Sequence, residues 1–199
     1  MKKSIAIVFV LALALCGMAG AFAQSESDFT VSTENGKVTI TKYTGKGGAV
    51  VIPAKIGGNP VTSIGWFVFS GCTGLTSVSI PAGVTSIGMS AFENCTSLTS
   101  VTIPARVTDI GSSAFRGCTG LTTISIPASV TSIGDGAFGS CTGLTSIRIG
   151  ANVEIRWSRV NEVYSNDAFE HGFPDYYNTN GKKAGVYTYR NGAWSYAAQ

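Results

Sequence analysis

The chain has 199 residues, of which 44% are hydrophobic, and it carries 14 basic and 11 acidic residues for a formal net charge of +3. Two of the basic residues, Lys2 and Lys3, belong to an apolar leader, so the rest of the chain is close to neutral. Because no basic stripe follows the remaining sequence, the electrostatic footprint of a protein that binds nucleic acid or an anionic membrane is absent.

The first 23 residues predict a secretory signal peptide. A basic start is followed by an apolar run from Ile5 to Leu15 and by the small-residue pattern Ala21-x-Ala23, which is typical of a cleaved leader. The run of about eleven apolar residues is shorter than the roughly twenty that a membrane-spanning helix needs. Cys16 leaves a lipoprotein open as the less favoured alternative, because the bulky Leu15 precedes it. We expect a protein that is secreted or lies at the cell surface, with the periplasm as an alternative.

Residues 24–60 predict a cap and an incomplete coil. Alternating apolar residues flank Asn35-Gly36, a dipeptide that favours a two-residue hairpin turn. The segment from Val50 to Pro53 then resembles the strand of the repeats that follow, and a short excess at 57–60 separates it from them. We expect the hairpin to cover the open end of a repeat array.

Residues 61–152 consist of four near copies of one 23-residue unit, each with a cysteine at the same point: Cys72, Cys95, Cys118 and Cys141. Between the shared apolar positions lie mostly serine, threonine and glycine, so a single unit cannot enclose a core of its own. Stacked units would turn each apolar position into a continuous row, with strands about 4.8 Å apart. We therefore expect a β-rich solenoid of parallel strands with 23-residue coils.

Positions within the unit predict its local structure. The segment from Leu75 to Ile80 should form a strand that Pro81 ends, because proline cannot donate to a sheet. Val84 to Ile87 should form a second extended segment, and Ala91 to Cys95 should return as an irregular or short 3₁₀ stretch. The repeated phenylalanines should stack under the turns, and the repeated glycines should adopt positive φ. These residues are Phe92, Phe115 and Phe138, and Gly65, Gly88, Gly111 and Gly134.

Residues 153–199 predict a degenerate fifth coil and a second hairpin cap. The repeat pattern resumes at Val153 and recovers at Phe169 after an insertion, and Asn191-Gly192 then lies between alternating aromatic residues. A cap over the open end of the solenoid is the favoured interpretation of these aromatics, and an exposed platform for sugar binding is the alternative. With a two-residue turn, Tyr189 would face Trp194, and Tyr187 would face Tyr196, all on one side.

The repeated unit resembles the BspA-like, or Treponema-type, leucine-rich repeat. The resemblance is carried by the pattern Leu75-x-x-Val78-x-Ile80-Pro81-x-x-Val84-x-x-Ile87-Gly88-x-x-Ala91-Phe92-x-x-Cys95. It covers four full repeats, about half of the chain. It implies a curved leucine-rich-repeat solenoid of the kind found on secreted or surface-exposed microbial proteins. Several such proteins bind host matrix proteins such as fibronectin, or other microbial cells.

The four cysteines of the repeats leave three states open. An exported chain with four cysteines would ordinarily form two disulfides, and stacking would bring neighbouring Cα atoms within bridging range. Parallel Cβ vectors do not favour the disulfide dihedral, so buried free thiols are the favoured interpretation. A zinc site fits least, because a straight row cannot surround one ion tetrahedrally.

The sequence offers little for catalysis. His171 is the one histidine, and no nucleophile motif or phosphate-binding glycine loop accompanies it. Serines and threonines recur by repeat position, so none stands out from its copies as a nucleophile would. We predict a protein that is not an enzyme and that uses no metal or cofactor.

The outward strand positions form the candidate binding face. This face is small, roughly 500 Å², against the roughly 800 Å² per partner of a stable interface. We therefore predict weak, multiplied contacts with protein partners, extracellular matrix proteins among the candidates, and no nucleic acid. The face consists of Thr76, Ser77, Ser79, Thr99, Ser100, Thr102, Thr122, Thr123, Ser125, Thr145, Ser146 and Arg148, with Trp66 and Phe67 as candidate exposed anchors unless they pack under the N-terminal hairpin.

Two other functions stay open at this point. One is a structural envelope protein whose repeats self-assemble. The other, favoured less, is a sugar- or ice-binding protein that would use the aromatic or hydroxyl faces. The sequence names neither the ligand nor the oligomeric state.

Overall fold

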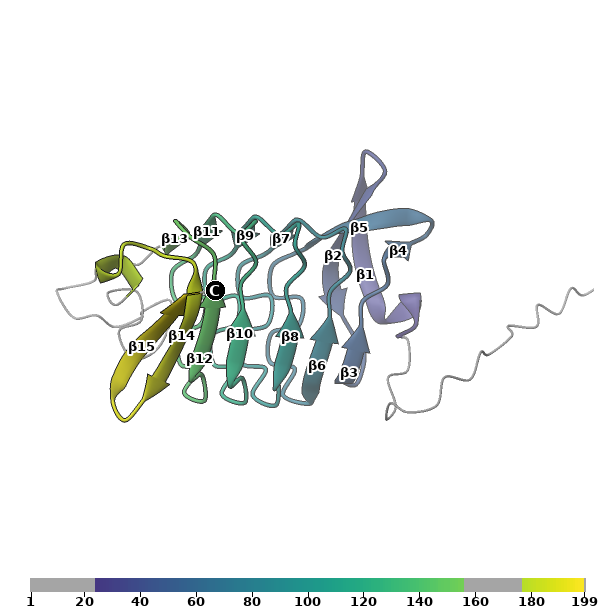
Figure 1. Ribbon diagram of the computed structural model, residues 1–199. Helices are drawn as coiled ribbons and strands as arrows, with labels where there is room; N and C mark the ends of the chain where they lie inside the picture. Colours follow the sequence, from purple (N-terminus) through teal and green to yellow (C-terminus); the bar gives the residue numbers. More distant parts are fainter. Residues whose placement is uncertain (1–23, 156–176, 199) are drawn as a thin grey trace, which may run out of the picture.

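The chain folds into a β-solenoid of about five turns, in which each repeat forms one coil (Figure 1). The computed structural model describes residues 24–155 and 177–198. Parallel strands join coils of 23 residues, and a β-hairpin lies at each end, so the predicted fold class is confirmed. The middle of the predicted fifth coil, with Phe169 and His171, lies outside the described residues.

Each coil contributes one strand to a first row, which crosses the lower front of Figure 1. Residues one repeat apart lie opposite each other, as Val78 lies opposite Val101 and Ile124 opposite Ile147. Hydrogen bonds divide the row into two groups, β3-β6-β8 and β10-β12-β14-β15. Its repeat strands are β3 (Gly48–Val51), β6 (Leu75–Ser79), β8 (Ser100–Thr102), β10 (Thr123–Ser125) and β12 (Ser146–Ile149).

A second row lies along the upper side of Figure 1 and uses the other extended segment of each coil. Ile87 pairs with Ile64 of the coil before and with Ile110 of the coil after, and all three side chains are buried. The two rows therefore enclose a single core between them. The strands are β5 (Asn59–Ile64), β7 (Ser86–Ile87), β9 (Asp109–Ile110), β11 (Ser132–Ile133) and β13 (Glu154–Ile155).

Aromatic rings stack along the core from coil to coil. Phe69, Phe92, Phe115 and Phe138 are fully buried, with ring centroids 4.9, 5.1 and 5.2 Å apart and planes within 9° of parallel. The turns that carry these rings are also joined between coils, because the N–H of Phe92 donates to the carbonyl of Ala114 at 2.7 Å. The predicted phenylalanine stack is confirmed, and the return segment is made of turns.

The prediction that the repeated glycines adopt positive φ is wrong. Gly65, Gly88, Gly111 and Gly134 are absent from the positive-φ residues of the described chain. A Cβ on Gly88 would lie 2.7 Å from the carbonyl carbon of Gly65, and one on Gly111 would lie 2.7 Å from that of Gly88. Successive coils therefore approach too closely here for a side chain. The positive φ falls two residues later in each coil, at Phe67, Ser90, Ser113 and Gly136.

The N-terminal hairpin joins β1 (Phe29–Glu34) to β2 (Lys37–Tyr43) through the predicted Asn35-Gly36 turn, whose φ values are 50° and 70°. It follows a short 3₁₀ turn, η1 (Glu26–Asp28). Strand β2 pairs in parallel with β5, and β4 (Lys55–Ile56) folds back on β5. The ring of Tyr43 continues the phenylalanine stack, 4.8 Å from Phe69, so the hairpin covers the end of the core.

The C-terminal hairpin joins β14 (Gly185–Arg190) to β15 (Ala193–Ala198) through Asn191-Gly192, with φ values of 52° and 80°. Strand β14 pairs antiparallel with β12, so the hairpin continues the first row (Figure 1). The register is as predicted: Tyr189 lies opposite Trp194, and Tyr187 lies opposite Tyr196. The hairpin thus both ends the solenoid and widens one of its sheets.

We predict that Phe115→Ala destabilises the fold by about 3–5 kcal/mol, because it leaves a cavity between two stacked rings. Thermal or urea unfolding measures the loss, and Phe115→Leu, which keeps part of the volume, should lose less. A midpoint for Phe115→Ala within a few degrees of the parent would contradict the role of the stack.

A second prediction concerns the close approach of the coils. Gly111→Ala should destabilise the chain by roughly 1–3 kcal/mol, because its Cβ would lie 2.6 Å from the backbone nitrogen of Met89. Gly74→Ala is the matched control, since the nearest neighbour of its Cβ would be the carbonyl oxygen of Lys46 at 3.4 Å. Equal unfolding midpoints for the two variants would refute the steric explanation.

Candidate interaction surfaces

The first row presents its outward side chains to solvent as one face, which we call the strand face. In β6, Leu75 and Val78 point into the core, whereas Thr76 and Ser79 are exposed. The same alternation holds in the next coils. Of the twelve predicted face residues, Ser77 and Ser146 are half-buried and the other ten are exposed, namely Thr76, Ser79, Thr99, Ser100, Thr102, Thr122, Thr123, Ser125, Thr145 and Arg148.

Hydrogen bonds between coils hold part of this face in place. The hydroxyl of Thr99 donates to the carbonyl of Thr76 at 3.1 Å, and that of Thr145 donates to the carbonyl of Thr122 at 3.4 Å. A hydroxyl that donates inward still has lone pairs directed to solvent. The face is therefore an ordered array of hydrogen-bonding groups, with Arg148 as the charged member of the predicted set.

The C-terminal hairpin extends the strand face beyond the predicted set. Arg148 lies opposite Val186 across the β12–β14 pair. Because Tyr187 is buried, its neighbours Val186 and Thr188 point outward, and Arg190 at the end of β14 is exposed. The sequence predicted this hairpin but not its position, since a hairpin pattern does not say which strand its outer edge will join.

The aromatic residues of the hairpin lie mainly on the inner side. Tyr187 is fully buried, and its ring makes an edge contact with Tyr177 at 5.7 Å. Trp194 and Tyr196 are half-buried and pack against the core. This arrangement supports the cap interpretation, because a sugar platform would need its rings in water.

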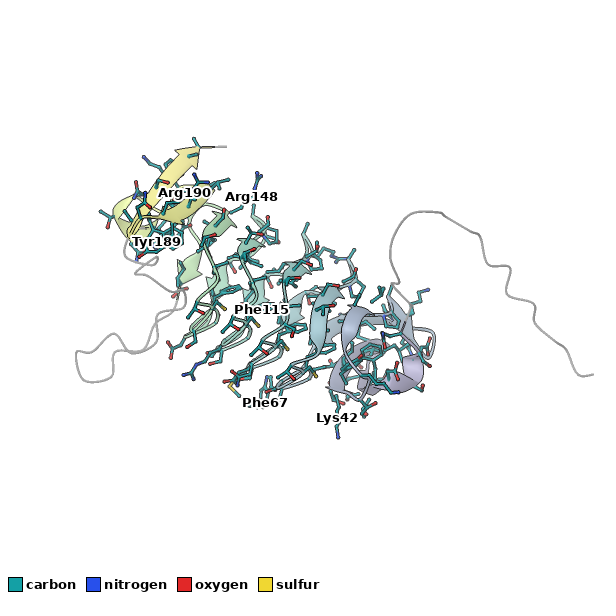
Figure 2. The ribbon with its side chains drawn as sticks, turned by 90° about the horizontal axis from the view of Figure 1, so that it is seen from below. Lys42, Phe67, Phe115, Arg148, Tyr189 and Arg190 are labelled. Atoms are coloured by element: carbon teal, nitrogen blue, oxygen red, sulfur yellow. The ribbon has the colours of Figure 1, made fainter. Side chains whose placement is uncertain are left out.

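Trp66 and Phe67 lie on a different side of the solenoid. They are 70% and 53% exposed, and Met89, at the equivalent position to Trp66 in the next coil, is 39% exposed. They do not pack under the N-terminal hairpin. Figure 2 shows Phe67 on the opposite edge of the solenoid from Arg148, so the structure does not bring the two candidate anchors and the strand face together. Met89 is not among the anchors predicted from the sequence, although it occupies the position of Trp66 in the next repeat.

The four cysteines of the repeats are free thiols. Cys95, Cys118 and Cys141 are fully buried, and their Sγ atoms donate to the carbonyls of Phe69, Phe92 and Phe115 at 3.2, 3.2 and 3.1 Å. A hydrogen bond with the Cys95 side chain, together with burial, raises the pKa of the Cys118 thiol well above its ordinary value. Burial also raises the pKa of Cys72, which is half-buried at the start of the row.

Within residues 24–155 and 177–198, no group of three or more histidine, cysteine or acidic side chains is placed to hold a metal ion. Over the same residues, no helix is long and apolar enough to cross a membrane. His171 lies outside the described residues, so its predicted place as a surface or cap histidine stays a prediction.

A family model described as the BspA type leucine rich repeat region, in six copies, matches residues 51–162. The chain is similar to the crystal structure of a leucine-rich repeat protein of T. pallidum, with 34% identity and a TM-score of 0.66 over 69% of this chain and 65% of that one. No curated protein matches the chain.

Two further crystal structures are similar to the chain. A leucine-rich repeat protein from Bacteroides ovatus has 31% identity and a TM-score of 0.55 over 70% of this chain and 38% of that one. A leucine rich cell surface protein from Faecalibacterium prausnitzii has 33% identity and a TM-score of 0.51 over 70% of this chain and 43% of that one. The chain therefore spans less than two thirds of each of these three relatives.

The cysteine environments predict a graded reactivity. In the native chain, iodoacetamide should leave Cys95, Cys118 and Cys141 intact until the chain is unfolded, because these three side chains are fully buried and out of reach of the reagent. It should modify the half-buried Cys72 slowly, because only a thiolate reacts and the raised pKa of Cys72 disfavours the thiolate. Because the pKa of Cys72 is raised, the rate of its modification should keep rising at pH values where the rate for a free cysteine has levelled off. Peptide mass spectrometry measures each site, and a disulfide or early modification of Cys118 would disprove the assignment.

Proposed function

Because the chain belongs to the BspA-type leucine-rich repeat family, we propose that it is an exported interaction protein that binds protein partners through its strand face. The leader-like sequence of residues 1–23 supports export, and one similar protein, from Faecalibacterium prausnitzii, is described as a cell surface protein. The proposed location is the cell surface or the medium, and the proposed role is adhesion to matrix proteins or to other cells. This role is not enzymatic.

The observation that carries the proposal is the ordered, hydroxyl-rich and weakly charged strand face. Its residues lie on paired strands, and two of its hydroxyls, those of Thr99 and Thr145, are oriented by hydrogen bonds to the coil before. A surface that is already ordered loses little side-chain entropy when a partner binds. Hydroxyl groups can both donate and accept, so the face suits a partner rich in exposed backbone and polar side chains.

The size of the face sets the strength of binding. The seven strands of the extended first row, at about 4.8 Å spacing and about 17 Å length, give roughly 570 Å². This area is smaller than the roughly 800 Å² per partner of an ordinary stable interface. We therefore propose weak individual contacts that become strong when many copies act together on one surface.

The test compares charged substitutions on and off the strand face. Ser100→Glu and Thr123→Glu should each lower the affinity of the mature chain, residues 24–199, for immobilised fibronectin by about tenfold. Thr131→Glu is the control, because Thr131 is exposed beside the second row. Surface plasmon resonance on a surface with a low density of immobilised fibronectin measures the affinity, and a surface with a high density measures the avidity.

Three outcomes would contradict the proposal. Equal loss of binding in the control would show that the strand face is not the contact. Absence of binding to fibronectin and to every other matrix protein tried would remove the adhesive role. Self-association in sedimentation without any heterologous binding would favour a structural, self-assembling protein instead.

A further inference from the structure

The large exposed apolar side chains of the described residues gather at one place, which we call the apolar patch: Trp66, Phe67 and Met89. Trp66 and Met89 occupy the same position in successive coils, and the N–H of Phe67 donates to the carbonyl of Met89 at 3.1 Å. The following coils carry Ser112 and Asp135 at the position of Trp66 and Met89. The patch is therefore confined to two coils and does not continue along the solenoid.

The backbone of Phe67 argues against an incidental exposure of the patch. Its φ is 59°, a conformation that a bulky residue rarely adopts. Ser90 and Ser113 hold the same conformation at the equivalent positions, with φ values of 53° and 55°, so a small residue suffices for the fold. An exposed phenylalanine gains little packing in return for this strain, and such an outlier points to a function.

The position and size of the patch decide what it fits. Its three side chains expose on the order of 300 Å², far below the roughly 800 Å² per partner that a second copy or a stable protein partner would bury. Figure 2 shows Phe67 at the outer edge of the solenoid, on the side opposite Arg148. Protruding tryptophan and phenylalanine side chains are typical of residues that enter the interface of a lipid bilayer.

We propose that the apolar patch docks the protein on a lipid bilayer surface. Trp66, Phe67 and Met89 enter the interfacial region, and the strand face then points away from the membrane and remains open to protein partners. The chain outside its leader is close to neutral, so insertion of apolar side chains drives the contact, and charge attraction does not. This inference goes beyond the proposed function, because the strand face can bind partners whether or not the patch meets a membrane.

The experiment uses a variant that copies the sequence of the chain's own third repeat. Trp66→Ser, Phe67→Ser and Met89→Ser together turn the first two coils into the Gly-Ser-Ser found at 111–113, which keeps a residue suited to the backbone at each position. Partition of the mature chain onto phosphatidylcholine vesicles should fall about tenfold in this variant. Binding of the parent should change little between about 0.05 and 0.5 M salt. Equal partition of parent and variant would overturn the proposal.

A fluorescence measurement gives a second, site-specific result. In a chain with Trp157→Phe and Trp194→Phe, the fluorescence emission of Trp66 should shift to the blue on binding to vesicles. Brominated phosphatidylcholine in the vesicles should quench this emission. A matched reporter carrying Thr122→Trp on the strand face, with all three native tryptophans replaced by phenylalanine, should not be quenched. Quenching of both reporters, or of neither, would overturn the proposal. A dimer of the parent that the triple serine variant abolishes would also overturn it, because the patch would then be a contact between copies.

Discussion

The structure depends on the in-register stacking of coils, because no coil can satisfy its own backbone or bury its own apolar side chains. Every side of a coil is bonded to a neighbour. In the turns, the N–H of Phe115 donates forward to the carbonyl of Ala137 at 2.7 Å, whereas in the first row the N–H of Thr99 donates backward to Thr76 at 3.0 Å. A register slip of one residue would break these bonds and would also turn core residues toward solvent.

The repeated cysteine is explained by the same stacking. The carbonyl of Phe69 accepts the N–H of Cys72 at 3.0 Å and the thiol of Cys95 at 3.2 Å. A carbonyl oxygen has two lone pairs. One accepts the N–H within its own coil, and the thiol of the next coil donates to the other. Cysteine combines this weak donor with a small apolar volume, which alanine or valine would not provide. The row of thiols is thus part of the packing, and its spacing is a consequence of the repeat.

The period of the sequence predicted the coil, the strands and the phenylalanine stack, and the Asn35-Gly36 and Asn191-Gly192 turns predicted the hairpin registers, because each follows from residues at fixed offsets. It did not predict the reason for the repeated glycines. A missing Cβ is equally consistent with positive φ and with close approach. The structure distinguishes the two, because the φ of these glycines is not positive and a Cβ on Gly88 would lie 2.7 Å from the carbonyl carbon of Gly65. It also did not predict where β14 would pair, because that depends on the open edge of β12 rather than on the hairpin sequence.

The separation of the two candidate surfaces follows from how a coil repeats its positions. A given position always faces the same direction, so serine and threonine in the strand build the strand face, while the residue after the repeated glycine always faces the opposite edge. Trp66 and Met89 fill that second position in the first two coils, and Ser112 and Asp135 fill it in the next two. Two neighbouring side chains of one kind are therefore enough to create a local patch without disturbing the strand face. Such a solenoid can acquire a second surface by substitution at one repeated position, because the side chain at that position belongs neither to the core nor to the strand face.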